Sequence, residues 1–95
     1  MSAYLVIDID ISNPVNFKEY ENKIFDVIAH FGGRPIVHDN NVTTMEGDWQ
    51  PKRLVILEFP NKQSIEAFFN SEMYEPLKKI RRANSTGKAI VVEGL

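Results

Sequence analysis

The sequence contains no cysteine and no long run of hydrophobic residues. Without thiols, the chain cannot form disulfide bonds, cysteine-based metal sites or a thiolate nucleophile. A helix that spans a bilayer needs about 20 consecutive apolar residues, and no segment approaches that length. The N-terminal residues MSAYLVIDIDI have no basic leader and reach Asp8 and Asp10 too early for a signal peptide. We therefore expect no membrane segment and a cytoplasmic location.

An excess of positive charge is also missing. The chain has 11 Lys and Arg against 13 Asp and Glu, so its formal net charge is -2. A general nucleic-acid surface needs clustered cations that neutralise phosphates, so we expect no nucleic-acid partner. The two histidines, His30 and His38, fall in different predicted elements and lack the spacing of a metal motif. We also find no phosphate-binding loop or dinucleotide fingerprint, and we expect neither a metal nor a cofactor.

The 95 residues fit one domain, residues 1–95. Hydrophobic periodicity and turn residues predict strands and helices in the order β-α-β-β-α-β. The order is typical of an α+β, ferredoxin-like sandwich, in which helices cover one face of a four-stranded antiparallel sheet. The expected strands are residues 4–11, 34–38, 42–46 continuing as 53–59, and 88–93. The first expected helix starts at residue 14. The second starts at residue 61, has a break at 70–71, and is followed by a turn at 84–87.

The two central strands are predicted to have apolar residues on both faces. Side chains alternate along a strand, so Leu5 and Ile7 share one face while Tyr4 and Val6 share the other. The second face also receives Leu54, Ile56 and Ile36, together with one parity of residues 90–92. No further helix remains to cover this face, and so large an exposed apolar patch is unusual for a monomer. We therefore predict a two-fold homodimer in which the open faces pack together.

Four segments carry a resemblance to a known family: GGR at 32–34, EGDWQPKRLVILEFP at 46–60, YEPLKKIR at 74–81 and VEG at 92–94. Together they resemble the domain-of-unknown-function 1330 family. The resemblance covers nearly the whole chain and implies the dimeric α+β barrel superfamily, with the ferredoxin-like fold and the face-to-face dimer. It implies no established activity. Relatives in that superfamily include small cofactor-independent monooxygenases, muconolactone isomerase-like enzymes and haem-degrading enzymes.

Asp8 and Glu58 are the candidate catalytic residues. The predicted topology places them on adjacent central strands and on the same open face. Two neighbouring carboxylates raise the pKa of one of them, which suits general acid–base catalysis. The alternative is that both are solvated near a strand end, or paired with Arg34 or Arg53.

Arg34, His38 and Arg53 are the candidate ligand-binding cations. Placed beside a partly apolar cavity, they could hold the carboxylate or enolate of a small substrate. The alternative is that they only neutralise Asp8, Glu58 and Glu46.

Three aromatic residues complete the set of candidates. Tyr20 and Tyr74 lie on apolar helical stripes and are either core residues or hydroxyl groups at the edge of a cavity. Trp49, in the predicted hairpin, is expected to fold over the open end of the sheet or anchor the dimer, with a ligand lid as the alternative. The basic cluster at residues 78–82 is interpreted as a solvated helix face.

Three functions stay open from the sequence. The first is a homodimer that binds a small acidic or aromatic molecule in a cavity near the dimer face. The second is a cofactor-independent isomerase or monooxygenase acting on a small activated carbon acid, with Glu58 or Asp8 as the base. The third is a structural or partner-binding dimer without catalysis. Fold class alone does not decide among them.

Overall fold

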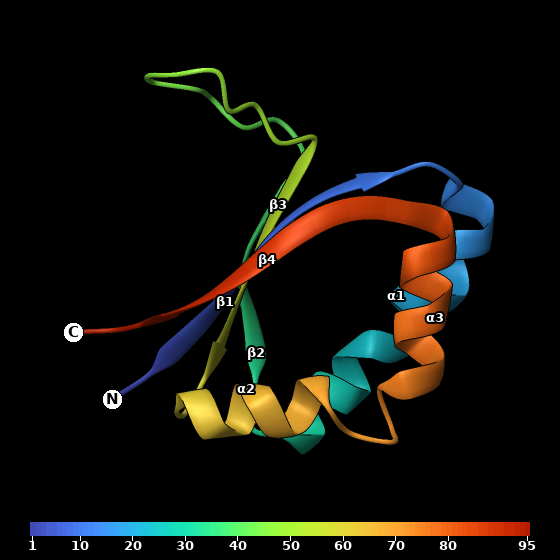
Figure 1. Cartoon of the computed structure of the whole chain (residues 1–95), viewed down its shortest axis with the longest axis vertical. Helices are drawn as coiled ribbons and strands as arrows, with labels where there is room; N and C mark the ends of the chain where they lie inside the picture. Colours follow the sequence, from blue (N-terminus) through green and yellow to red (C-terminus); the bar gives the residue numbers. More distant parts are fainter.

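A computed structural model describes residues 1–95 and shows a four-stranded sheet with three helices. The strand order is β2-β3-β1-β4, and all neighbouring strands are antiparallel. The three helices lie on one side of the sheet (Figure 1). This arrangement confirms the predicted α+β ferredoxin-like fold. The elements are β1 (Ala3–Ile11), α1 (Pro14–His30), β2 (Arg34–Asp39), β3 (Arg53–Phe59), α2 (Lys62–Phe69), α3 (Glu75–Asn84) and β4 (Ser85–Glu93).

The helices begin where the sequence supplies caps. The Asn13 side chain accepts a hydrogen bond from the Asn16 amide at 3.1 Å, and proline occupies the first turn of α1. Asn61 caps α2 in the same way, and Pro76 lies in the first turn of α3. α1 is followed by Gly32, whose φ of 80° is easily adopted only by glycine. None of the helices is long and apolar enough to cross a membrane.

The hydrophobic core lies between the sheet and the helices. Leu5 of β1 and Leu57 of β3 are cross-strand partners, and both are buried under the helices. Aromatic rings extend the core toward α2 and α3, where the ring centroids of Phe59 and Phe68 are 5.5 Å apart and those of Phe68 and Tyr74 are 4.5 Å apart. Apolar burial of this kind supplies most of the stability of a small domain. The face assigned to the helices from residue parity is confirmed.

Two predicted boundaries are wrong. Residues 42–46 form no strand, because the segment between β2 and β3 is a projecting loop held by its own side chains (Figure 1). In that loop, the Thr44 hydroxyl donates to the Trp49 carbonyl at 2.7 Å, and Gln50 donates to the Val42 carbonyl. Residues 84–87 form no separate turn, since β4 already begins at Ser85, directly after α3. The pairing of β1 with β4 therefore runs through Ile11 and Ser85.

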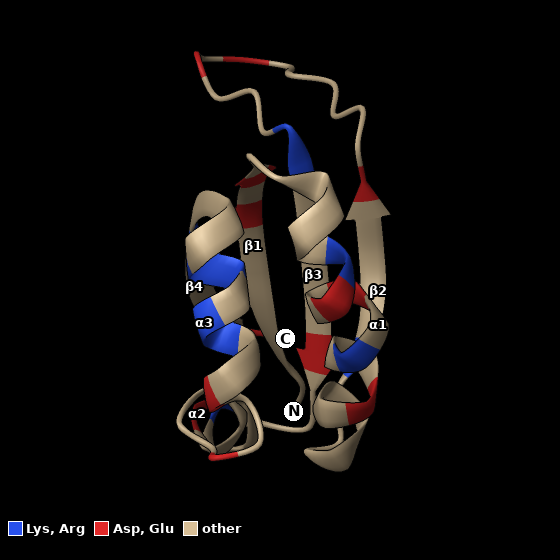
Figure 2. Ribbon diagram, turned by 90° about the vertical axis from the view of Figure 1, so that its right-hand side faces the viewer, with Lys and Arg blue, Asp and Glu red and all other residues tan.

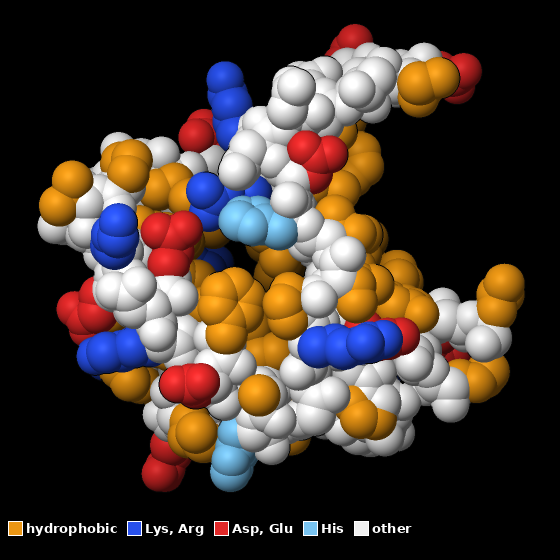
Figure 3. All heavy atoms as spheres, turned by 180° about the vertical axis from the view of Figure 1, so that it is seen from behind, with side chains coloured by type: hydrophobic (Ala, Val, Ile, Leu, Met, Phe, Trp, Pro, Cys, Tyr) orange, Lys and Arg blue, Asp and Glu red, His pale blue; other side chains and the backbone are white.

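The second face of the sheet carries apolar side chains and no helix. Cross-strand pairs place Val6 between Ile56 and Ile90, and Tyr4 beside Val92. Ile90 remains 59% exposed. Figure 3 shows hydrophobic side chains along the concave side between the projecting loop and the chain ends. We call this surface the open face. Whether a second copy covers it stays a prediction.

Candidate functional site

Two adjoining cavities lie between the sheet and the helices. The β4-side cavity, of about 460 Å³, is bordered by β1, β4, α2 and α3. The β2-side cavity, of about 250 Å³, is bordered by α1, β2 and β3. Both are on the helix side of the sheet, away from the open face where the sequence led us to expect a site. The five residues that line both cavities are Ile7, Ile9, Tyr20, Leu57 and Arg81.

The cavities exist because the helices do not cover the sheet evenly. Leu5 and Leu57 are fully buried, whereas Ile7 and Val55, on the same face, are only half-buried. α1 and α3 lie beside each other over this face (Figure 2), and the cavities occupy the remaining space beneath them. The floor shared by the two cavities is therefore made of aliphatic side chains from the central strands.

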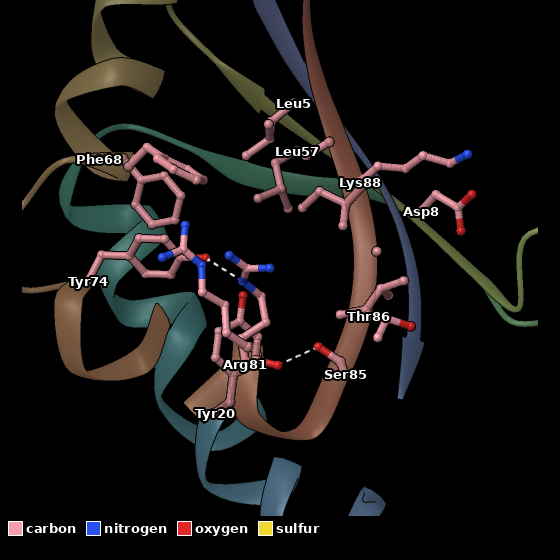
Figure 4. Close-up of a pocket in the computed structure, with 16 residues that line it drawn as sticks. Leu5, Asp8, Tyr20, Leu57, Phe68, Tyr74, Arg81, Ser85, Thr86 and Lys88 are labelled. Carbon is pink, nitrogen blue, oxygen red and sulfur yellow. Dashed lines mark hydrogen bonds between the residues drawn. The ribbon is translucent and has the colours of Figure 1, made fainter. Parts of the chain in front are cut away.

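Arg81 is the main polar group of this site. Its Nε donates a hydrogen bond to the Tyr74 hydroxyl at 3.1 Å, and it takes part in none of the ion pairs. Tyr74 is 3% exposed, so its ring and hydroxyl fix the orientation of the guanidinium. The side chains of Tyr20, Phe68, Tyr74 and Arg81 converge on the β4-side cavity (Figure 4). The remaining guanidinium N–H groups have no protein acceptor and suit a carboxylate, phenolate or enolate oxygen.

Tyr20 supplies a neutral hydroxyl group beside Arg81. Burial raises the pKa of Tyr20 far above its usual value, Tyr74 raises it further, and only Arg81 acts in the opposite direction. The phenol therefore keeps its proton throughout the ordinary pH range, so it can donate a hydrogen bond but cannot act as a base. Tyr20 and Tyr74, both predicted as candidates, thus lie together at the β4-side cavity.

Sequence reasoning missed Arg81, because the basic cluster at 78–82 was interpreted as a solvated face. That interpretation is wrong for two of its members. Lys78 is only 7% exposed, with its Nζ 4.3 Å from the centroid of the Phe69 ring. Arg81 lines both cavities. The signal was present in the spacing: residues 74, 77, 78 and 81 follow the helical repeat that places side chains on one buried stripe.

The two candidate carboxylates, Asp8 and Glu58, are not brought together. Both lie on the open face, but Glu58 pairs with Tyr4 and Asp8 pairs with Leu54. At about 3.3 Å per residue, four positions along β1 separate them by roughly 13 Å. The geometry therefore does not support a catalytic pair of adjacent carboxylates. Parity had assigned the face correctly but not the position along the strand.

Glu58 is held as a carboxylate by its neighbours. Arg34 Nη2 and Nε lie 2.8 and 2.9 Å from Glu58 Oε1, and the Tyr4 hydroxyl donates to Oε2 at 3.2 Å. The bond from Arg34 is the main cause of a lowered pKa for Glu58, followed by a bond from Ser2. The structure thus favours the alternative of an ion pair with Arg34. Neither residue lines the cavities.

Asp8 is also engaged, by the projecting loop. Trp49 Nε1 donates to Asp8 Oδ2 at 2.6 Å, while the Trp49 side chain remains 55% exposed. Asp8 borders the β4-side cavity, but its side chain points away from the aromatic residues there (Figure 4). Trp49 lines neither cavity, so the geometry does not favour a lid over them. Its role as a dimer anchor stays a prediction.

The three predicted cations are divided between the two faces by a bulge in β2. The pairing register shifts between Pro35 and Val37, so Val37, and not Ile36, pairs with Ile56. Arg34 consequently shares the open face with Glu58, whereas His38 pairs with Val55 and lines the β2-side cavity. A bulge moves every later side chain to the other face, and residue parity alone does not reveal it.

Arg53 reaches the β2-side cavity but is already paired. Arg53 Nη1 lies 3.2 Å from Glu21 Oε2, and its Nε donates to Asn40 Oδ1 at 2.6 Å. The predicted anion-binding role therefore fits Arg53 less well than Arg81. No group of three potential ligand side chains lies close enough to hold a metal ion.

The fold is shared with solved structures of low sequence identity. A protein of unknown function from Rhodopseudomonas palustris has a TM-score of 0.81 and 15% identity, covering 99% of this chain and 82% of that one. SnoaB, a cofactor-independent oxygenase from Streptomyces nogalater, has a TM-score of 0.69 and 14% identity, covering 99% and 93%. A putative antibiotic biosynthesis monooxygenase from Nitrosomonas europaea has a TM-score of 0.62 and 16% identity, covering 100% and 99%. The protein therefore has the α+β fold of the antibiotic biosynthesis monooxygenase-like proteins.

The family follows from the sequence. The profile of the domain of unknown function DUF1330 matches residues 2–95. The chain belongs to the DUF1330 family, which confirms the resemblance found from its sequence segments. A comparison with curated proteins finds no match.

Proposed function

We propose that this protein is a cytoplasmic homodimer that binds a small aromatic anion in the β4-side cavity. One observation carries the proposal. Arg81 is half-buried at the cavity, is oriented by a hydrogen bond to Tyr74, and has no carboxylate partner. An unpaired cation in a partly desolvated site binds an anion more strongly than an exposed one, because water screens the charge less.

The rest of the cavity wall favours an aromatic ligand. Phe68, Phe69 and Tyr74 line it on the helix side, and the aliphatic residues of β1 and β3 form its floor. Aromatic side chains bind planar apolar groups by edge and face contacts. Tyr20 adds a neutral donor beside Arg81, so an oxygen atom placed here can accept hydrogen bonds from both residues.

A pair of matched ligands tests the binding proposal. Isothermal titration calorimetry of the wild-type protein would compare 2-naphthoate with 2-naphthamide, which has a similar shape and no charge. Hydrogen bonds to a charged group contribute about 1.5–3 kcal/mol, so the acid should bind roughly 10- to 150-fold more tightly than the amide. Equal affinity for the two, or no binding of the acid, would contradict the proposal.

The homodimer is supported by the open face. Val6, Ile56, Ile90 and their neighbours form an apolar surface that no element of the chain covers. A second copy of the same surface is its simplest complement. Light scattering after size-exclusion chromatography at micromolar concentration should give twice the 10.9 kDa of one chain. A mass of 10.9 kDa would overturn this part of the proposal.

A cofactor-independent oxygenase is the second candidate, favoured by the fold shared with SnoaB. Arg81 and Tyr20 would then stabilise a substrate phenolate or enolate that reacts with dioxygen. Glu58 is on the opposite face of the sheet and would not act as the base for a molecule in the cavity. Dioxygen uptake with 1-naphthol should fall in Arg81→Met and persist in Glu58→Gln. If the wild-type protein takes up no dioxygen, the oxygenase function is refuted and the ligand-binding function still stands. If the protein also binds no acid, only the third function, a structural or partner-binding dimer, is left.

A further inference from the structure

We propose that the ligand carries its anionic group near the middle, between two apolar arms that occupy the two cavities. This inference rests on the proposed function and specifies the class of ligand: a diaryl or fused-ring molecule with a central carboxylate, phenolate or enolate. The structural basis is the position of Tyr20 and Arg81, which line the β4-side and the β2-side cavities alike.

The two cavities adjoin each other across the helix side of the sheet. They share the floor residues Ile7, Ile9 and Leu57, and they share Tyr20 and Arg81 between them. The β4-side cavity lies toward one edge of the sheet and the β2-side cavity toward the other, because β4 and β2 are the two edge strands. An anion bound to Arg81 therefore has unfilled space on both sides.

The β2-side cavity is apolar once its own charges are paired. Arg53 forms an ion pair with Glu21 and also donates a hydrogen bond to Asn40. Neither Arg53 nor Glu21 is therefore free to bind a polar ligand. His38 is exposed at the rim. The remaining lining residues are aliphatic or aromatic: Phe17, Ile24, Phe25, Ile28, Pro35 and Val55. Figure 3, which shows the side of β2 and α1, has a hollow with hydrophobic side chains at its bottom.

The two cavities therefore differ in chemistry: Arg81 offers an unpaired charge to the ligand, whereas the rest of the β2-side cavity suits an apolar arm. Each arm would bury apolar surface, whereas a second charged group in the β2-side cavity would lose hydration with only the exposed His38 as an unpaired polar neighbour. A ligand with one arm would fill only the β4-side cavity, beside Phe68, Phe69 and Tyr74.

Phenylacetate and diphenylacetate test this inference, because they share the carboxylate and differ by one ring on the same carbon. Calorimetry on the wild-type protein should show that diphenylacetate binds at least about tenfold more tightly than phenylacetate, as expected for burial of a second ring. Val55→Trp places a large side chain in the β2-side cavity, since Val55 lines only that cavity. The variant should lose the advantage of diphenylacetate to within about twofold and keep its affinity for phenylacetate.

The matched control is Val15→Trp, the same change on α1 at a residue that is 82% exposed and lines neither cavity. It should retain the wild-type preference for diphenylacetate. If Val55→Trp changes neither affinity, or weakens both acids equally, the two-armed ligand is overturned while the proposed function stands. If the wild-type protein binds neither acid, the proposed function fails and this inference fails with it.

A second measurement does not depend on the folding of Val55→Trp. Intermolecular nuclear Overhauser effects from diphenylacetate bound to the wild-type protein should reach the methyl groups of both Val55 and Ala89, one from each cavity. Contacts confined to Ala89 and its neighbours in the β4-side cavity would overturn the inference.

Discussion

Replacement of Arg81 by methionine tests how the site would hold an anion. Met retains much of the length and apolar volume of Arg but removes the charge and the Nε donor. The lost bond to the Tyr74 hydroxyl should lower the free energy of unfolding by about 1 kcal/mol. The lost hydrogen bonds to a ligand carboxylate should cost about 1.5–3 kcal/mol, which is roughly a 10- to 150-fold rise in the dissociation constant.

Arg82→Met provides the matched control on the same helix. Arg82 also borders the β4-side cavity, but it is exposed and forms no hydrogen bond or ion pair. Removing an exposed charge should change binding by at most about 1 kcal/mol, and less at high salt. Calorimetry with 2-naphthoate and urea unfolding would be measured on both variants. Equal losses of affinity in the two variants, or unchanged affinity in Arg81→Met, would refute the reasoning.

Three further predictions concern stability. Because the folded-state pKa of Glu58 is lowered, its stabilising effect is present above about pH 4.3 and is lost as pH falls. The free energy of unfolding of Glu58→Gln in urea should therefore differ from that of the wild type at neutral pH and converge with it in acid. Tyr20 has a raised pKa, so its stabilising effect is present below about pH 10 and lost above it; phenolate absorbance should show one tyrosine that ionises only as the protein unfolds in alkali. Gly33→Ala would place a Cβ 2.6 Å from the Phe59 ring, and this overlap should lower the free energy of unfolding by about 1–3 kcal/mol, measured by thermal unfolding. Gly47→Ala has no atom within 4 Å and should cost only about 1 kcal/mol, because of its positive φ. Equal costs for the two variants would contradict the packing argument.

The fold could be predicted because its signals are local. Caps at Asn13 and Asn61 and the alternation in residues 4–11 specify where elements begin and which face each side chain takes. The strand expected at 42–46 failed for a different reason. Its residues have strand-like patterning, but hydrogen bonds from Thr44 and Gln50 within the loop replace those of a ladder.

The site was harder to predict, because it depends on register and tertiary packing. Parity placed Asp8 and Glu58 on one face, but only the register shows that four positions separate them. The bulge in β2 moved His38 to the helix side, away from Arg34. Arg81 was hidden by its basic neighbours, although its spacing from Tyr74 follows the buried stripe of α3.

The most direct test of the account is to locate the bound anion by amide and methyl chemical-shift mapping. Titration of 2-naphthoate into isotope-labelled protein should shift the signals of Ile7, Leu57 and Arg81, which line the cavities. Shifts concentrated instead at Ile56 and Ile90, on the open face, would contradict a binding site beneath the helices.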